Sequence, residues 1–168
     1  MDNTTLSLIF SAVALLISFL TFFIWNTKRQ KNLKDEATFS TRPLQLQAYE
    51  RLVVLTERIS LPNLVSRTNQ PGLSAREMQL LLLESIKQEC EYNSSQQIYV
   101  SPVAWQALIN LKEQNMLIIN QVAQTLPADA KGIDLSKRIM EIIIAQDKNA
   151  LHNIVLDALN YEARKMMK

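Results

Sequence analysis

Residues 6–25 read LSLIFSAVALLISFLTFFIW, a stretch of twenty residues without a single charged side chain. A helix rises about 1.5 Å per residue, so this stretch is long enough to cross a hydrocarbon core of about 30 Å. Lipid offers no partner to unpaired peptide groups, which requires the segment to be helical. We therefore predict that residues 6–26 form one transmembrane helix, preceded by a short extracytoplasmic tail at residues 1–5.

A cleaved signal peptide is the rival interpretation of the same stretch. It requires a basic segment before the apolar residues and a small-residue cleavage site after them. The first five residues, MDNTT, contain no basic side chain, and the apolar stretch ends in Phe22, Phe23, Ile24 and Trp25. The sequence therefore favours a retained anchor.

The charges that flank the apolar stretch are asymmetric. Residues 28–34 read KRQKNLK and contain four basic side chains, Lys28, Arg29, Lys31 and Lys34, whereas Asp2 is the only charged residue before the stretch. The positive-inside rule then places the N-terminus outside and the rest of the chain in the cytoplasm, with Trp25 at the membrane interface. The basic cluster either only sets this topology or also attracts anionic lipid headgroups. Residues 27–42 form a basic, polar connector.

Small side chains line one side of the predicted transmembrane helix. They are separated by four, three, four and three residues and therefore share one face: Ser7, Ser11, Ala14, Ser18 and Thr21. In lipid, small residues let a second helix approach closely, and hydroxyl groups can bond across to it. Alternatively, the hydroxyl groups bond back to the preceding turn of their own helix. The first interpretation makes these residues a packing seam for a membrane partner.

Beyond the connector, the composition favours helices over sheets. Glycine is scarce, with two residues in the whole chain, and Leu, Ile, Gln, Glu, Lys and Ala dominate. Apolar residues recur every three or four positions over about 43–60, and Pro43 suits the first turn of a helix. We predict an all-α protein in which residues 43–168 form a cytoplasmic bundle of four or five helices.

Two further helix starts carry clear capping signals. Ser74 and Glu77 are spaced as a capping box, in which each side chain bonds the backbone N–H of the other residue. Ser101 suits the N-cap of a later helix, because Pro102 at the first helical position needs no backbone donor. We expect helices to begin at both places.

Other segments leave the helix boundaries open. Residues 61–72 contain two prolines, two asparagines and a glycine, which predicts a loop with at most a short helical turn. Residues 135–168 contain neither glycine nor proline, so one long helix and two consecutive helices both fit, with Asn149 as the weakest point.

Residues 91–101, EYNSSQQIYVS, are uncharged after Glu91 and rich in amide and hydroxyl groups. We predict an ordered loop with extended backbone. Loops concentrate function, so this one is a candidate partner-binding loop through Tyr92, Gln96, Gln97 and Tyr99. Its polar side chains could equally satisfy the ends of neighbouring helices.

Charged residues on the first cytoplasmic helix have two interpretations. Glu50, Arg51, Glu57 and Arg58 alternate in sign but are not at the spacings at which ion pairs form within one helix. They either form a solvated face or pair with other helices.

The residues that carry chemistry are few. Cys90, the single cysteine, lies between Glu89 and Glu91, and neighbouring carboxylates raise a thiol pKa, which opposes nucleophilic reactivity. His152 is the single histidine, and two glycines cannot build a Gly-rich phosphate loop. We expect no catalytic residue, no cofactor and no metal site, and therefore no enzyme. The formal net charge of +2 points to no nucleic-acid partner.

Three stretches carry a resemblance to a known family: LQAYERLVVLTERI at residues 46–59, EYNSSQQIYVSPVAW at residues 91–105 and GIDLSKRI at residues 132–139. With these stretches the chain resembles a family of single-span membrane proteins from Bacteroidota, to which no activity is assigned. The resemblance covers most of the chain. It implies a helical cytoplasmic part and a bacterial inner membrane, and it transfers no catalytic residue.

Two classes of function fit these expectations. The first is a non-catalytic accessory subunit or adaptor of an inner-membrane complex, which binds integral membrane proteins through the seam and the helical domain. The second is a membrane-tethered regulatory domain that recruits a soluble cytoplasmic protein or an anionic lipid surface. The bilayer is a partner in both, and a homo-oligomer is compatible with either.

Overall fold

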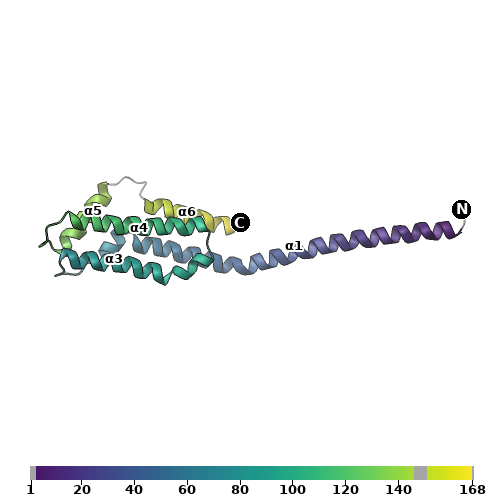
Figure 1. Cartoon of the computed structure of the whole chain (residues 1–168), viewed down its shortest axis with the longest axis horizontal. Coiled ribbons are helices and arrows are strands. Elements are labelled where there is room, and N and C mark those ends of the chain that lie inside the picture. The colour runs from purple at the N-terminus through teal and green to yellow at the C-terminus, as the bar shows by residue number, and fades with distance from the viewer. Residues whose placement is uncertain (1–2, 146–150, 168) are drawn as a thin grey trace. The chain divides into compact units, whose positions relative to one another are not determined.

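A computed structural model describes residues 3–145 and 151–167, with side chains described for residues 14–29, 41–145 and 151–167. The chain divides into two compact units, Met1–Pro43 and Leu44–Lys168. The described elements are all helical (Figure 1), which confirms the predicted all-α class. In chain order they are α1 (Asn3–Ile59), α2 (Leu61–Thr68), α3 (Ala75–Tyr92), the 3₁₀-helix η1 (Ser94–Ile98), α4 (Pro102–Gln124), α5 (Gly132–Ala145) and α6 (Leu151–Met167).

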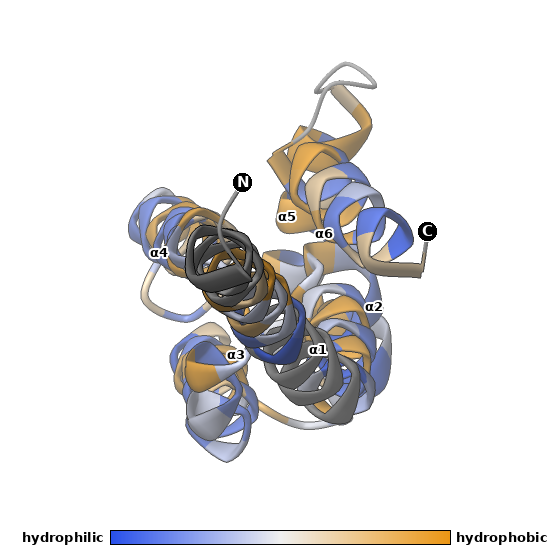
Figure 2. Ribbon diagram, turned by 90° about the vertical axis from the view of Figure 1, so that its right-hand side faces the viewer, coloured by the Kyte–Doolittle hydropathy of each residue, from blue (hydrophilic) through white to orange (hydrophobic). Residues whose placement is uncertain are grey.

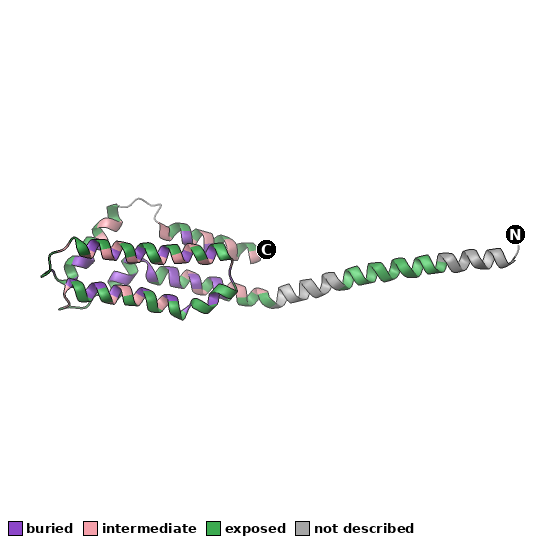
Figure 3. Cartoon of the chain, viewed as in Figure 1, coloured by how far each residue is buried: buried purple, intermediate pink, exposed green. Residues whose placement is uncertain are grey.

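The first unit consists of the N-terminal part of α1. Its backbone is helical from Asn3, and its apolar side chains between Leu15 and Trp25 are exposed (Figure 3). Across the residues whose placement the structure describes, no helix is both long enough and apolar enough to span a membrane.

Helix α1 continues through Pro43 into the second unit. The prediction that Pro43 begins a new helix is therefore wrong. A proline inside a helix removes one backbone hydrogen bond, but the sequences on both sides favour helix, and α1 accommodates the loss. The boundary between the two compact units falls directly after this residue.

The second unit is a helical bundle with one apolar core. Helix α4 packs beside α3, α5 and α6, and α3 also packs against α2 and α5. Figure 2 shows both hydrophobic and hydrophilic positions on the helices of this unit. Each large side chain removed from water contributes about 1.5–3 kcal/mol to folding. The largest fully buried residues are Leu52, Leu55, Ile59, Leu64, Met78, Leu82, Ile86, Leu108, Leu111, Ile119, Leu135 and Ile139.

Both predicted caps are confirmed. The Ser74 hydroxyl accepts a hydrogen bond from the Glu77 N–H at 3.3 Å, and the Ser74 N–H donates to the Glu77 carboxylate at 2.9 Å. The Ser101 hydroxyl accepts from the Ala104 N–H at 3.0 Å, and Pro102 occupies the first position of α4. These contacts satisfy donors that every helix start leaves unpaired.

Three local predictions need correction. The segment predicted as a loop after residue 60 contains α2, because Pro62 lies in the first turn, where a helix needs no donor. The segment predicted to be an ordered loop with extended backbone contains η1, and Ile98 is exposed there. The bundle therefore contains more helices than the four or five predicted. The described C-terminal region forms two helices, and Asn149 lies outside the described residues.

Candidate functional site

The predicted transmembrane seam is described in part. Ala14, Ser18 and Thr21 are exposed on α1, and the Thr21 hydroxyl lies 2.9 Å from the carbonyl oxygens of both Ile17 and Ser18. Thr21 therefore bonds back to its own helix, as the second interpretation of the seam expects. The side chains of Ser7 and Ser11 lie outside the described residues.

The predicted membrane-interface residues are also described in part. Trp25 is exposed, and the guanidinium of Arg29, one turn later, lies 5.3 Å from the centre of its ring. This distance is that of a cation–π contact. Lys28 is exposed, and the side chains of Lys31 and Lys34 lie outside the described residues.

The four residues of the candidate partner loop differ in how far they are exposed to solvent. Gln96 is buried at 7% exposure and donates to the Ser95 hydroxyl, whereas Gln97 is exposed. Tyr99 is 38% exposed, and its N–H donates to the Gln96 carbonyl at the end of η1. Tyr92 is the last residue of α3 and is 75% exposed. The Tyr92 ring therefore lies outside the predicted loop and lines a groove.

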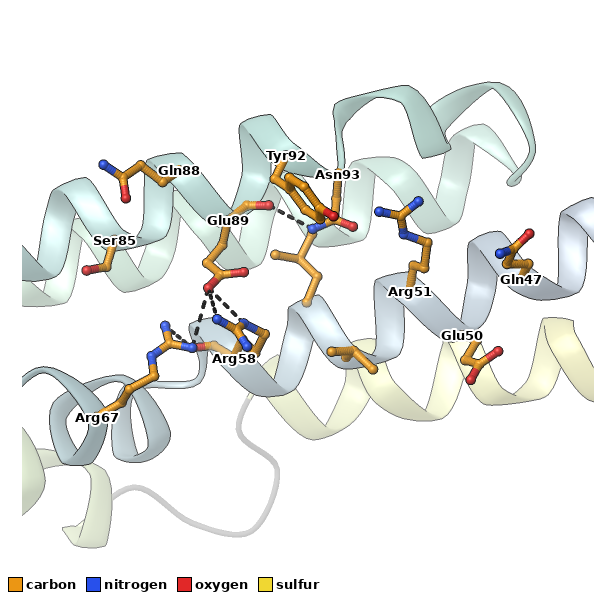
Figure 4. A pocket seen from close by; sticks show the side chains of 12 residues that line it. Gln47, Glu50, Arg51, Arg58, Arg67, Ser85, Gln88, Glu89, Tyr92 and Asn93 are labelled. Atoms are coloured by element: carbon orange, nitrogen blue, oxygen red, sulfur yellow. Dashed lines mark hydrogen bonds and ion pairs between the residues drawn. The ribbon is translucent and has the colours of Figure 1, made fainter.

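This groove has a volume of about 870 Å³ (Figure 4). Three helices line it, and most of the lining residues are polar or charged. Helix α1 contributes Gln47, Glu50, Arg51, Val54, Leu55 and Arg58, α2 contributes Arg67, and α3 contributes Ser85, Gln88, Glu89, Tyr92 and Asn93.

One end of the groove holds an ion cluster centred on Glu89, whose side chain is 17% exposed. The Arg58 guanidinium contacts Glu89 Oε1 through Nη2 at 2.6 Å and Nε at 2.7 Å, and Arg67 Nη1 lies 3.4 Å from the same oxygen. The hydrogen bond and the charge of Glu89 hold the pKa of Arg58 above its ordinary value. Arg58 therefore pairs with another helix, one of the two interpretations of the first helix's charges.

Arg51 lies farther along the groove, toward Gln47. Its guanidinium lies 5.4 Å from the centre of the Tyr92 ring, so the contact joins α1 to α3. Among the described residues, Arg51 forms no ion pair. Figure 4 shows Arg51 of α1 beside Tyr92 of α3 and apart from the cluster around Glu89.

A smaller cavity of about 360 Å³ adjoins His152. His152 Nε2 lies 3.7 Å from Glu57 Oε2, and the buried Nδ1 has no hydrogen-bond partner in the described part of the chain. Asn115 lines the same cavity and donates to the Ile59 carbonyl at 2.8 Å. This bond satisfies the carbonyl at the last residue of α1, so Asn115 has a structural role.

The other titratable candidates are poorly placed for chemistry. Burial, and secondarily Glu89 and Glu91, raises the pKa of the Cys90 thiol, although Lys112 lowers it. A thiol with a raised pKa supplies little thiolate for nucleophilic attack. Within the described ranges, no three His, Cys, Asp or Glu side chains are grouped so that they could hold a metal ion.

Sequence patterns did not predict a polar network that joins three helices. The Tyr49 hydroxyl donates to Glu162 Oε2 and accepts from the Ser101 N–H at 3.0 Å, and the Ser101 hydroxyl donates to Glu162 Oε1 at 2.9 Å. Burial, and then the hydrogen bond to Glu162, raises the pKa of Tyr49. One sequence signal could have indicated this network: Tyr49 lies on the apolar face of its helix. A tyrosine hydroxyl that is buried usually has a hydrogen-bond partner.

Comparison with known proteins identifies a family. No curated protein and no solved structure matches the chain. Residues 2–166, nearly the whole chain, match a family of unknown function, DUF7935. The chain belongs to the DUF7935 family.

Proposed function

We propose that this protein is a membrane-anchored, non-catalytic adaptor subunit of a bacterial inner-membrane complex. The observation that carries the proposal is the uncharged stretch at residues 6–25, which lies within one continuous helix, α1. Its length suits a bilayer core. In this arrangement the N-terminus is outside, and the helical bundle is in the cytoplasm.

The residues after the stretch support this orientation. Lys28, Arg29, Lys31 and Lys34 follow it, and the cation–π contact of Arg29 with Trp25 suits an interfacial tryptophan. In the bundle, the buried amide of Asn115 serves structure, because it donates to the carbonyl at the end of α1. The open groove, by contrast, presents charged side chains to solvent. An adaptor requires this combination of an anchor and a binding surface.

Membrane extraction of the full chain tests the anchor. We expect the protein to stay in the membrane pellet after alkaline carbonate washing and to be released by mild detergent. Release by carbonate alone would refute the anchor, because lipid-embedded helices resist it.

Substitution of the seam tests the membrane partner. The double variant Ala14→Leu, Ser18→Leu should reduce the amount of integral membrane protein that co-purifies stoichiometrically in mild detergent. The larger side chains would block the close approach of a second helix. Phenylalanine at Leu16 and Leu20 adds bulk to the opposite side of the helix and serves as the matched control. Equal co-purification by both double variants would refute the seam.

The alternative function is a membrane-tethered regulatory domain, and the open groove favours it. This function predicts soluble, substoichiometric partners and no stoichiometric membrane partner. The same purification therefore distinguishes the two functions.

A further inference from the structure

The groove of about 870 Å³ has the form of a slot between two helix faces. On α1 the lining positions run from Gln47 to Arg58 at intervals that keep to one side of a helix, and on α3 they run from Ser85 to Asn93 in the same way. The slot extends along α1 for about 16 Å at the helical rise per residue. A hollow of this length is suited to a chain segment and is much longer than a single small anion.

Positive charge is in excess in this slot. Its lining includes three arginines, Arg51, Arg58 and Arg67, and two acids, Glu50 and Glu89. Glu89 is shared by Arg58 and Arg67, and three contacts converge on one of its oxygens. Two guanidinium groups thus share one carboxylate, while the guanidinium of Arg51 lies near an aromatic ring and forms no ion pair among the described residues.

The arginines also remain accessible. The side chain of Arg58 is 50% exposed, and that of Arg67 is 35% exposed. Guanidinium groups carry five N–H donors each and bind carboxylates in a fixed, two-pronged geometry. The cluster around Glu89 can therefore accept a further carboxylate without losing the pair that holds α1 to α3.

We propose that the groove between α1, α2 and α3 binds an acidic helical segment of a partner protein. Arg51 and Arg58 are seven residues apart on α1, which separates them by about 10.5 Å along the axis. Two carboxylates seven residues apart on a partner helix have the same separation and lie on one face. Such a helix matches the charges of the slot and packs against α1 and α3 as a third helix. This inference rests on the proposed function only in that the bundle binds a protein.

Peptide binding to the purified full chain in detergent tests the proposal. The probe is a fluorescein-labelled, Ala-rich helical peptide of about 20 residues, long enough to form a helix, with two glutamates seven residues apart. One control peptide carries glutamine at both positions, and another carries the two glutamates on opposite faces. We expect fluorescence anisotropy to show binding about fivefold tighter for the probe than for either control, and weaker as salt is raised.

Three variants of the chain sharpen this test. Arg51→Gln should weaken probe binding about fivefold, because it removes the guanidinium that has no ion-pair partner in the described part of the chain. Arg138→Gln is the matched control, since Arg138 on α5 is 56% exposed and pairs with neighbouring Glu141. Glu89→Gln should tighten probe binding several-fold, because it removes the carboxylate that competes for Arg58 and Arg67.

Two results would overturn the groove as an acidic-helix site. One is equal binding of the probe and the glutamine peptide, and the other is an equal effect of Arg51→Gln and Arg138→Gln. Circular dichroism of each variant confirms that it is folded. The peptide-binding assay uses purified protein, so its outcome does not depend on the membrane anchor. The groove proposal can therefore be refuted while carbonate extraction supports the anchor, and the anchor can be refuted while the peptide binds.

Discussion

Replacement of Tyr49 by phenylalanine removes one hydroxyl from the network that joins α1, α4 and α6. The ring is 4% exposed and its shape is conserved by the change, so packing is retained. Two interactions are lost: the bond donated to Glu162 and the bond accepted from the Ser101 N–H. The substitution therefore isolates the polar contribution of this residue.

The magnitude follows from these two bonds. A hydrogen bond to a charged group contributes about 1.5–3 kcal/mol, and an ordinary one contributes about 1 kcal/mol. Glu162 keeps its bond from the Ser101 hydroxyl and is only partly buried, so water replaces some of the loss. We expect Tyr49→Phe to lower the free energy of unfolding by about 2–3 kcal/mol, out of about 5–15 kcal/mol for a typical domain.

Urea unfolding followed by tryptophan fluorescence measures this change. The chain contains two tryptophans, so a Trp25→Phe background leaves Trp105 in α4 as the reporter for the bundle. We expect the urea midpoint of the Tyr49→Phe variant to fall by about 1 M, given the usual dependence of unfolding free energy on urea. In hydrogen exchange, the peptide containing the Ser101 amide should lose protection.

Tyr161→Phe is the matched control for this substitution. Tyr161 lies on α6 and is 68% exposed, so removal of its hydroxyl should change stability by less than about 0.5 kcal/mol. If Tyr49→Phe and Tyr161→Phe have the same urea midpoint, the network does not hold the three helices together and the reasoning is refuted.

Three further predictions concern positions where the structure assigns a specific physical cause. Gly132→Ala should destabilise the bundle by about 1–3 kcal/mol in urea unfolding. The reason is that a Cβ at this position would lie 3.1 Å from both the Leu73 carbonyl oxygen and the Met78 Cβ. A urea midpoint equal to that of the parent chain would contradict this close approach. Asn115→Leu should lower the unfolding free energy by about 1–3 kcal/mol, because it leaves the buried Ile59 carbonyl without its donor; unchanged stability would show that water reaches this carbonyl. The folded-state pKa values of Cys90 and Tyr49 are raised from ordinary values of 9.0 and 10.0, so the unfolded chain loses these protons first. Their contribution is complete below about pH 9 and decreases as pH rises through the folded pKa values. Alkaline unfolding should therefore be less steep in a Cys90→Ala, Tyr49→Phe double variant, and identical pH profiles would refute the assignment.

The helical class and two of the helix starts could be predicted because their causes are local. The capping box at Ser74 and the Ser101–Pro102 start depend on residues within one turn, and both are present in the structure. Helix α2 was missed because Pro62 reads as a breaker, although it is tolerated in a first turn. Local signals of this kind cannot distinguish a proline that ends one helix from a proline that begins the next.

The groove could not be predicted, because its parts are distant in sequence. Arg58 and Glu89 are 31 residues apart, and no spacing rule relates them. The sequence left Arg58 open to pairing with another helix, and only packing of α1 beside α3 selects Glu89. Tyr92 was expected in a partner-binding loop, but it ends α3 and faces Arg51. The residue was a reasonable candidate, but its surroundings depend on tertiary structure.

Substitution of Arg51 should affect peptide binding much more than it affects the stability of the bundle. A cation–π contact at an exposed site is worth about 0.5–1 kcal/mol, so the contact with Tyr92 adds little to the bundle. The network at Tyr49 is worth several times more, and the Tyr49 side chain that carries it is buried. If the groove served only to hold α1 against α3, Arg51→Gln would affect binding and stability in parallel. An acidic-helix site instead requires that binding fall while the urea midpoint stays nearly constant, and Arg51 is the position at which the two effects come apart.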